Sequence, residues 1–184
     1  GADSMAGGAG NDTYVVDSLA DVIDEQGNKD TGDEIRTTAF SIVLAGSGGA
    51  IENATLLGAD DLDITGTSAN NRLIGNAGVN TLIGANGNDY LDGGAGDDII
   101  KGGAGNDMYV IDSTGDVIDE QGNLDSSDAV SISFSVNLSI LANGAVENAY
   151  AQSGFAISLT GNNAANILVG NAEANAISGG GGND

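Results

Sequence analysis

Apolar and polar residues recur with a period of nine along much of the chain. Cut every nine residues from Gly66, the sequence gives GTSANNRLI, GNAGVNTLI, GANGNDYLD, GGAGDDIIK and GGAGNDMYV. Each segment has Gly first, Asn or Asp sixth and a large apolar residue eighth, namely Leu73, Leu82, Leu91, Ile100 and Tyr109. GGAGNDTYV near the N-terminus and GNNAANILV, GNAEANAIS and GGGGND near the C-terminus fit the same frame. A fixed short period predicts a repeat architecture.

Each nonapeptide predicts a short strand and a tight loop. The last three residues alternate in burial with the eighth side chain inward, and the glycines allow the positive φ angles of a sharp turn. Two nonapeptides complete one flattened coil of 18 residues, and coils stack at a strand spacing of about 4.8 Å. We predict an all-β fold, a parallel β-roll or β-solenoid.

A second period of 95 residues lies over the first. GGAGNDTYVVDSLADVIDEQGN, from Gly7, returns as GGAGNDMYVIDSTGDVIDEQGN, from Gly102. Because both ends of the chain fall inside a nonapeptide, we expect a fragment of a longer array. We predict one array of two tandem units, divided into the end of a roll (1–15), an irregular β segment that links or caps (16–65), a central roll (66–110), a second copy of the irregular segment (111–160) and the truncated start of a further roll (161–184).

The charge of the chain favours cations as partners. It carries 27 acidic and 4 basic residues, a net charge of −23. Nucleic acid and anionic membrane surfaces need a positive face, so neither is an expected partner. We also expect no membrane insertion, because no apolar run approaches the roughly 18 residues of a span. No signal peptide is visible, and the absence of Cys excludes disulfides.

The stacking predicted above brings carboxylates together. A coil of 18 residues places Asp89 in line with Asp107, and two charges about 4 Å apart repel by roughly 4 kcal/mol at an effective dielectric of about 20. A divalent cation offsets this repulsion. With no His or Cys in the chain, ordinary zinc and copper sites are excluded, and an all-oxygen set of carboxylates and glycine carbonyls suits Ca²⁺.

The tandem segments GGAGDDIIK, GGAGNDMYV and GGAGNDTYV resemble the calcium-binding nonapeptide of the RTX (repeats-in-toxin), haemolysin-type family. The resemblance implies a parallel β-roll with Ca²⁺ held between loops of adjacent coils, export by a bacterial type I exporter, and folding outside the cell or at its surface. It implies backbone carbonyl ligands at the second and fourth positions, Gly8, Gly10, Gly87, Gly94, Gly96, Gly103 and Gly105. Its sixth-position carboxylate ligands are Asp12, Asp89, Asp98 and Asp107, with Asp3 and Asp184 in truncated units.

The sequence departs from the family pattern where Asn71, Asn80, Asn166 and Asn175 stand at the sixth position. We expect few or weak metal sites there, with stacked amides hydrogen-bonding along the coil instead. Continuing the frame past the nonapeptides predicts further calcium ligands at Asp21, Asp30, Asp116 and Asp125, with Asp98 facing Asp116 and Asp107 facing Asp125. The alternative is that these four are solvated acids on connecting loops.

Catalysis is not expected of this chain. Triads that need His or Cys are absent, and the acids recur with the repeat, unlike a single catalytic constellation. Two functions remain: a calcium-dependent folding and secretion module of an enzyme or toxin whose catalytic domain lies elsewhere, or a structural stalk of a surface layer or adhesin. Self-association through the array or contact with the cell surface would belong to the second.

Overall fold

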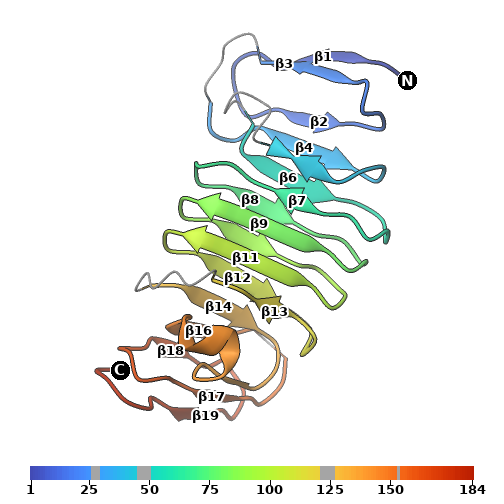
Figure 1. The fold of residues 1–184 in the computed structure, drawn as a ribbon. Coiled ribbons are helices and arrows are strands. Elements are labelled where there is room, and N and C mark those ends of the chain that lie inside the picture. Colours follow the sequence, from blue (N-terminus) through green and yellow to red (C-terminus); the bar gives the residue numbers. More distant parts are fainter. Residues whose placement is uncertain (26–29, 45–50, 121–126, 153) are drawn as a thin grey trace.

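The computed structural model describes residues 1–184 except 26–29, 45–50, 121–126 and 153. The chain winds through successive coils into one elongated stack, with its two ends at opposite ends of the stack (Figure 1). Every strand pairing is parallel. The predicted all-β parallel β-roll is therefore confirmed.

A nine-stranded sheet runs along most of the stack, in the order β2, β4, β6, β8, β10, β12, β14, β16 and β18. These strands are β2 (Thr13–Val15), β4 (Glu34–Thr37), β6 (Asn53–Leu56), β8 (Arg72–Ile74), β10 (Tyr90–Asp92), β12 (Met108–Ile111), β14 (Ala129–Ile132), β16 (Asn148–Ala151) and β18 (Leu168–Val169). Opposite it lies a five-stranded sheet of β5 (Ile42–Val43), β7 (Ile64–Thr65), β9 (Thr81–Asn86), β11 (Ile99–Ala104) and β13 (Val117–Ile118).

Two smaller sheets lie toward the ends of the stack. They are β1 (Ser4–Ala6) with β3 (Val22–Asp24), and β15 (Val136–Asn137), β17 (Ser158–Thr160) and β19 (Ala176–Ser178). A 3₁₀ turn, η2 (Leu141–Gly144), follows β15. Described parts of both irregular segments add strands to the two long sheets, so they continue the stack.

The number of residues per coil is 18 where nonapeptides stack on one another, and it is larger in parts of the irregular segments. The offset between hydrogen-bonded positions of adjacent coils is 18 from Asn71 to Asp89 and from Asp89 to Asp107. It is 21 from Asp107 to Asp128, and values of 19 to 23 occur elsewhere in the irregular segments. Paired strands keep a constant register across the wider coils, so the extra residues lie between the strands.

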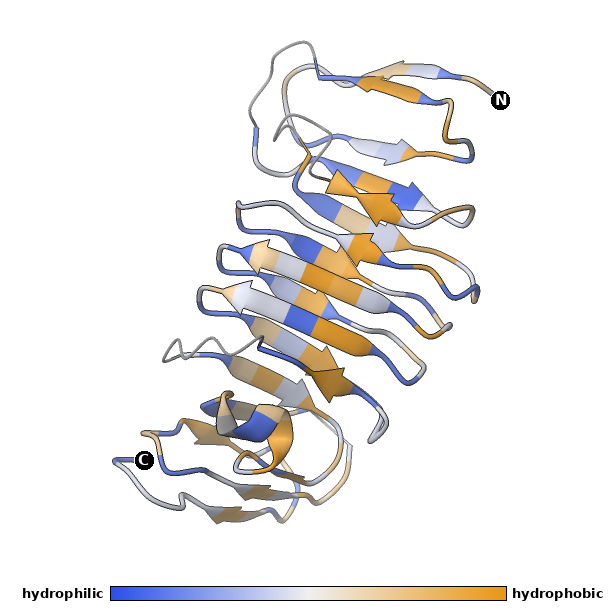
Figure 2. Cartoon of the chain, in the orientation of Figure 1, coloured by the Kyte–Doolittle hydropathy of each residue, from blue (hydrophilic) through white to orange (hydrophobic). Residues whose placement is uncertain are grey.

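The eighth residue of each nonapeptide forms the core. Leu73, Leu82, Leu91, Ile100 and Tyr109 are all fully buried, as predicted. Leu91 pairs with Leu73 on one side and Tyr109 on the other, so equivalent side chains contact one another from coil to coil. Figure 2 shows apolar positions recurring from strand to strand along the stack. Apolar burial of this kind is the main favourable contribution to folding.

Glycine at the first position leaves room for the sixth. A Cβ built on Gly84 or Gly93 would collide with the carboxylate of Asp89 or Asp98, respectively. At the fourth position, glycine is required for a different reason. Gly96 has φ +134°, and a Cβ there would lie 2.5 Å from the carbonyl oxygen of Gly78 in the preceding coil.

We expect Gly96→Ala to destabilise the roll more than Gly10→Ala. Gly10 also has a positive φ, +112°, but a Cβ there meets no atom within 4 Å. Both variants incur the roughly 1–2 kcal/mol of a left-handed backbone, and only Gly96→Ala adds the clash with Gly78. Urea unfolding in saturating calcium measures the difference. Equal losses for the two variants would show that contact between the loops is unimportant.

Candidate calcium sites at the coil edges

Sixth-position carboxylates form hydrogen-bonded columns along the stack. The backbone N–H of Asp89 donates to Asp107 Oδ1 at 2.8 Å, and that of Asn71 donates to Asp89 Oδ1 at 2.7 Å. In the neighbouring column, the Asn80 N–H donates to Asp98 Oδ1 at 2.8 Å, and the Asp98 N–H donates to Asp116 Oδ1 at 3.0 Å. Each carboxylate is thus fixed by the coil before it.

The second carboxylate oxygen, Oδ2, of Asp89 and of Asp98 makes no hydrogen bond. Asp89 is 3% exposed and Asp98 is fully buried, yet Oδ2 of each has no hydrogen-bond partner. Burial raises the pKa of Asp89 to about 7 and that of Asp98 to about 6. A buried ionised oxygen without a partner is costly, and a cation removes that cost.

Loop carbonyls of the preceding coil also lie near these carboxylates. All seven predicted glycines have positive φ angles, which let the loop turn sharply. A Cβ on Gly96 would lie 3.4 Å from Asp98 Oδ1 as well as 2.5 Å from Gly78 O, so carbonyl and carboxylate face one space. A Cβ on Gly87 would likewise lie 2.6 Å from the carbonyl of Ala69 in the preceding coil. Carboxylates with one unpartnered oxygen and loop carbonyls nearby together fit the all-oxygen ligand set of Ca²⁺.

Asparagines at the sixth position bond to backbone. The side-chain amide nitrogens of Asn71, Asn80 and Asn166 donate to the carbonyls of Glu52, Leu62 and Glu147 in the preceding coil. The Asn175 amide instead donates within its own loop, to the carbonyls of Asn171 and Glu173. An amide therefore supplies the N–H donors that a carboxylate lacks. These bonds to carbonyls replace the expected stacking of amide on amide.

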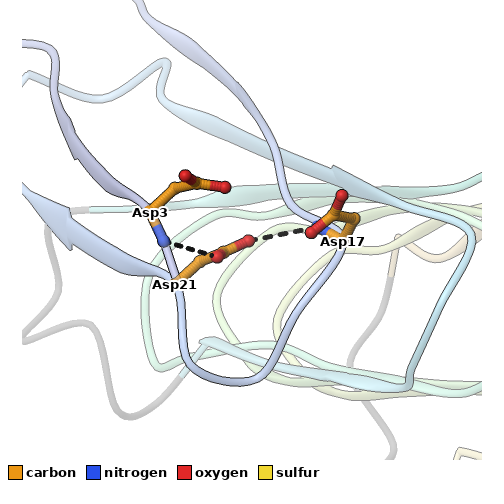
Figure 3. A group of neighbouring side chains, drawn as sticks. All are labelled: Asp3, Asp17 and Asp21. Carbon is orange, nitrogen blue, oxygen red and sulfur yellow. Dashed lines mark hydrogen bonds between the residues drawn. The ribbon is translucent and has the colours of Figure 1, made fainter. Parts of the chain in front are cut away.

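Asp21 and Asp116 each close a turn with Oδ2 and accept a hydrogen bond from the adjacent coil with Oδ1. Asp116 Oδ2 accepts from the N–H groups of Asp112 and Ser113. Asp21 Oδ1 accepts from the Asp3 N–H at 3.0 Å and Oδ2 from the Asp17 N–H at 3.1 Å (Figure 3). Hydrogen bonds from the backbone of Asp3 lower the pKa of Asp21. Carboxylate oxygens of Asp3, Asp17 and Asp21 lie within 4.8 Å of one another. Calcium ligation by Asp21 and Asp116 stays a prediction.

The columns continue through acids other than those the nine-residue frame selects. The Asp12 N–H donates to Asp33 Oδ1 at 2.8 Å, while Asp30 accepts from the Gly10 N–H at 2.6 Å. The Asp107 N–H donates to Asp128 Oδ1 at 2.7 Å, and Asp125 lies outside the described residues. Asp33 and Asp128 take the in-line place because these coils hold 21 residues. At the far end, Asp184 Oδ1 accepts from the Asn166 N–H.

Sequence reasoning missed six buried acids, although the 95-residue period carries a signal for each. Glu25, Asp33 and Glu52 return as Glu120, Asp128 and Glu147, and all six are at most 8% exposed. The Asp128 N–H donates to Glu147 Oε2 at 3.0 Å, which extends the column by another coil. Burial, with the charges of Asp128, Asp107 and Glu147 adding to it, raises the pKa of Glu120 to about 8.

A parallel β-roll with columns of buried carboxylates beside glycine carbonyls defines a calcium-binding repeat module. The family model described as the RTX calcium-binding nonapeptide repeat matches residues 1–23, 65–100, 74–109 and 160–184, just over half of the chain. The chain belongs to the RTX calcium-binding repeat family, and its nonapeptide repeats bind Ca²⁺. Comparison with curated proteins and with solved structures gives no match. In the described parts of the chain, no helix has the length and apolarity to cross a membrane.

Proposed function

We propose that this chain is a calcium-gated folding module, exported by a bacterial type I exporter and folded outside the cell or at its surface. Asp12, Asp89, Asp98 and Asp107 hold Ca²⁺ together with the second- and fourth-position carbonyls. The observation that carries the proposal is the unpartnered, buried Oδ2 of Asp89 and Asp98. These oxygens make the metal-free roll unfavourable and the calcium-bound roll favourable.

Few basic side chains are available to neutralise the buried carboxylates in place of a cation. Arg36 pairs with Glu34 at 2.7 Å and Lys101 with Asp119 at 3.5 Å. Arg72 lies over the ring of Tyr90, 5.2 Å from its centroid. With a net charge of −23, self-repulsion and the conformational entropy of the glycines oppose folding. Binding free energy then becomes folding free energy.

The affinity for Ca²⁺ distinguishes a folding switch from a site that is always occupied. Gating between a cytosol and the outside requires a Kd on the order of 10⁻⁴ to 10⁻³ M, as in other extracellular calcium modules. Isothermal titration calorimetry with Ca²⁺ measures it, and the same titration with Mg²⁺ is the control, because Mg²⁺ keeps its waters. A Kd below about 10⁻⁶ M, a cytosolic sensor range, would contradict the proposal.

We further propose that the parent polypeptide uses the array as a stalk. The two 95-residue units share one uninterrupted nine-stranded sheet, so stacking carries through the irregular segments and further units can extend it. A secretion module of an enzyme or toxin is the alternative. Small-angle scattering of chains with two and four units decides this: a stalk doubles in maximum dimension, whereas separate modules on flexible linkers do not give one rigid rod.

A further inference from the structure

Two buried tyrosines introduce polar groups into the apolar column. Tyr14 and Tyr109 stand at the eighth position, which Leu or Ile takes in the nonapeptides 66–101. The Tyr14 hydroxyl donates to Glu25 Oε1, and the Tyr109 hydroxyl donates to Glu120 Oε1. Glu25 is 6% exposed and Glu120 is 4% exposed. The same pair of residues is therefore buried in the same way in both copies of the long repeat.

Each glutamate lies near two aspartates of the neighbouring column. For Glu120 these are Asp107 and Asp128, whose charges help to raise its pKa, and for Glu25 they are Asp12 and Asp33. Asp12, Glu25 and Asp33 each present one carboxylate oxygen within 4.8 Å of the others. Asp12 Oδ2, Glu25 Oε2 and Asp33 Oδ2 are buried and have no hydrogen-bond partner. Glu52 Oε2 in the next coil is also buried without a partner. Since Ca–O distances are about 2.3–2.6 Å, ligands on opposite sides of one ion lie roughly 5 Å apart. The spacing of the three carboxylates fits one ion.

No lysine or arginine side chain can supply the positive charge that both carboxylate clusters need. Arg36, Arg72 and Lys101 contact other residues, as described above. Of the four basic residues only Lys29 is left, and the 95-residue period puts Leu124 in its place. A lysine at that position cannot neutralise the second cluster. A bound cation can neutralise both.

We propose that Glu25 and Asp33 form, with the sixth-position Asp12 as a shared ligand, a calcium site additional to the nonapeptide loop sites, and that Glu120 and Asp128 form its copy with Asp107. Glu25 and Asp33 lie outside the nonapeptide pattern, and the tyrosine hydroxyl orients the glutamate so that its other oxygen reaches the ion. Both sites fall where the coil widens to 21 residues. The ion clamps the wide coil to the regular one, at each junction between a roll and an irregular segment.

The test is a count of bound calcium in Glu25→Gln, Glu120→Gln and the double variant. Glutamine keeps the acceptor for tyrosine and removes the charge. By equilibrium dialysis against a chromophoric chelator, each single variant is expected to bind one ion fewer than the parent chain, and the double variant two fewer. Glu173→Gln changes an exposed side chain and is expected to bind the full number.

Terbium separates this site from the loop sites. The chain has four tyrosines and no tryptophan, so terbium emission sensitised by protein excitation reports ions near a tyrosine. We expect the double variant to lose most of this emission although it keeps all four tyrosines. Asp98→Asn, which removes a loop carboxylate on the other column, is expected to lose a calcium ion and keep the emission. That contrast distinguishes failure of this site from failure of the folding role.

An unchanged ion count in the double variant overturns the proposal. A double variant that is more stable than the parent chain in chelator, but only equally stable in calcium, would also overturn it. That result would mean that calcium does not stabilise the parent through these carboxylates, which would instead share protons. If the glutamine variants do not fold, a crystal of the parent chain grown with terbium decides. Anomalous density between Asp12, Glu25 and Asp33 supports the site, and its absence there at full occupancy of the loop sites excludes it.

Discussion

In excess EGTA the chain is expected to lose most of its far-ultraviolet strand signal, and to regain it when calcium is restored. Buried carboxylates at Asp89 and Asp98 and the clustered acids at Glu25 and Asp33 have unpartnered oxygens when no ion is present. A pair of carboxylates repels by roughly 4 kcal/mol at about 4 Å and an effective dielectric of about 20. Several such pairs exceed the 5–15 kcal/mol that typically holds a domain together.

Two controls make the chelation result specific. Magnesium at the same ionic strength separates calcium binding from charge screening, which acts over about 8 Å at physiological salt. A strand signal restored equally by magnesium or by sodium chloride would mean that the carboxylates need only screening. Undiminished strand signal in excess chelator would contradict calcium-gated folding, because the roll would then fold around its buried acids unaided.

The second large effect is expected from Leu91→Ala in saturating calcium. Leu91 is fully buried, and it pairs with Leu73 and Tyr109 in the centre of the nine-stranded sheet. Removing its side chain leaves a cavity that backbones fixed by strand pairing cannot fill, and such substitutions cost about 2–5 kcal/mol. Urea unfolding followed by circular dichroism measures the loss. Val79→Ala, at a side chain 52% exposed, is expected to change it by less than about 0.5 kcal/mol.

The shape of that transition carries further information. A repeat stack is held together by contacts between neighbouring coils only. A weakened central coil therefore lets the two halves of the stack unfold separately. We expect Leu91→Ala to broaden the unfolding transition and to reduce its dependence on urea concentration. A sharp, parallel shift would instead show that the two 95-residue units unfold as a single cooperative body.

Much of the nonapeptide geometry was predictable because it is local to nine residues. The frame that places Asp98 and Asp107 sixth also places glycines second and fourth, and those glycines have the positive φ angles expected; in the nonapeptide of Asp89 the second residue is Ala85, which has a positive φ as well. Leu73, Leu82 and Leu91 are buried as their eighth position predicts. In this part of the chain one coil equals two nonapeptides, so the column in which a residue lies follows from counting.

Counting in nines no longer identifies the in-line residue where a coil holds more than 18 residues. The frame selects Asp30 and Asp125, but Asp33 and Asp128 accept the in-line hydrogen bonds from Asp12 and Asp107. The frame also gives no reason to single out Glu25, which is buried against Tyr14. Three extra residues in a coil shift every later position relative to the column, and nothing in the local pattern fixes where they are accommodated.

The sequence by itself determined the repeat, the direction of the strands, the apolar column and the preference for a hard, oxygen-seeking cation. Each follows from which residue types recur every nine positions and what their backbones and side chains allow. Tertiary structure alone decided that the irregular segments continue the same sheets and that Glu25, Asp33 and their copies meet Asp12 and Asp107. That choice depends on how many residues each coil holds between paired strands, and parallel pairing with the neighbouring coil sets this number.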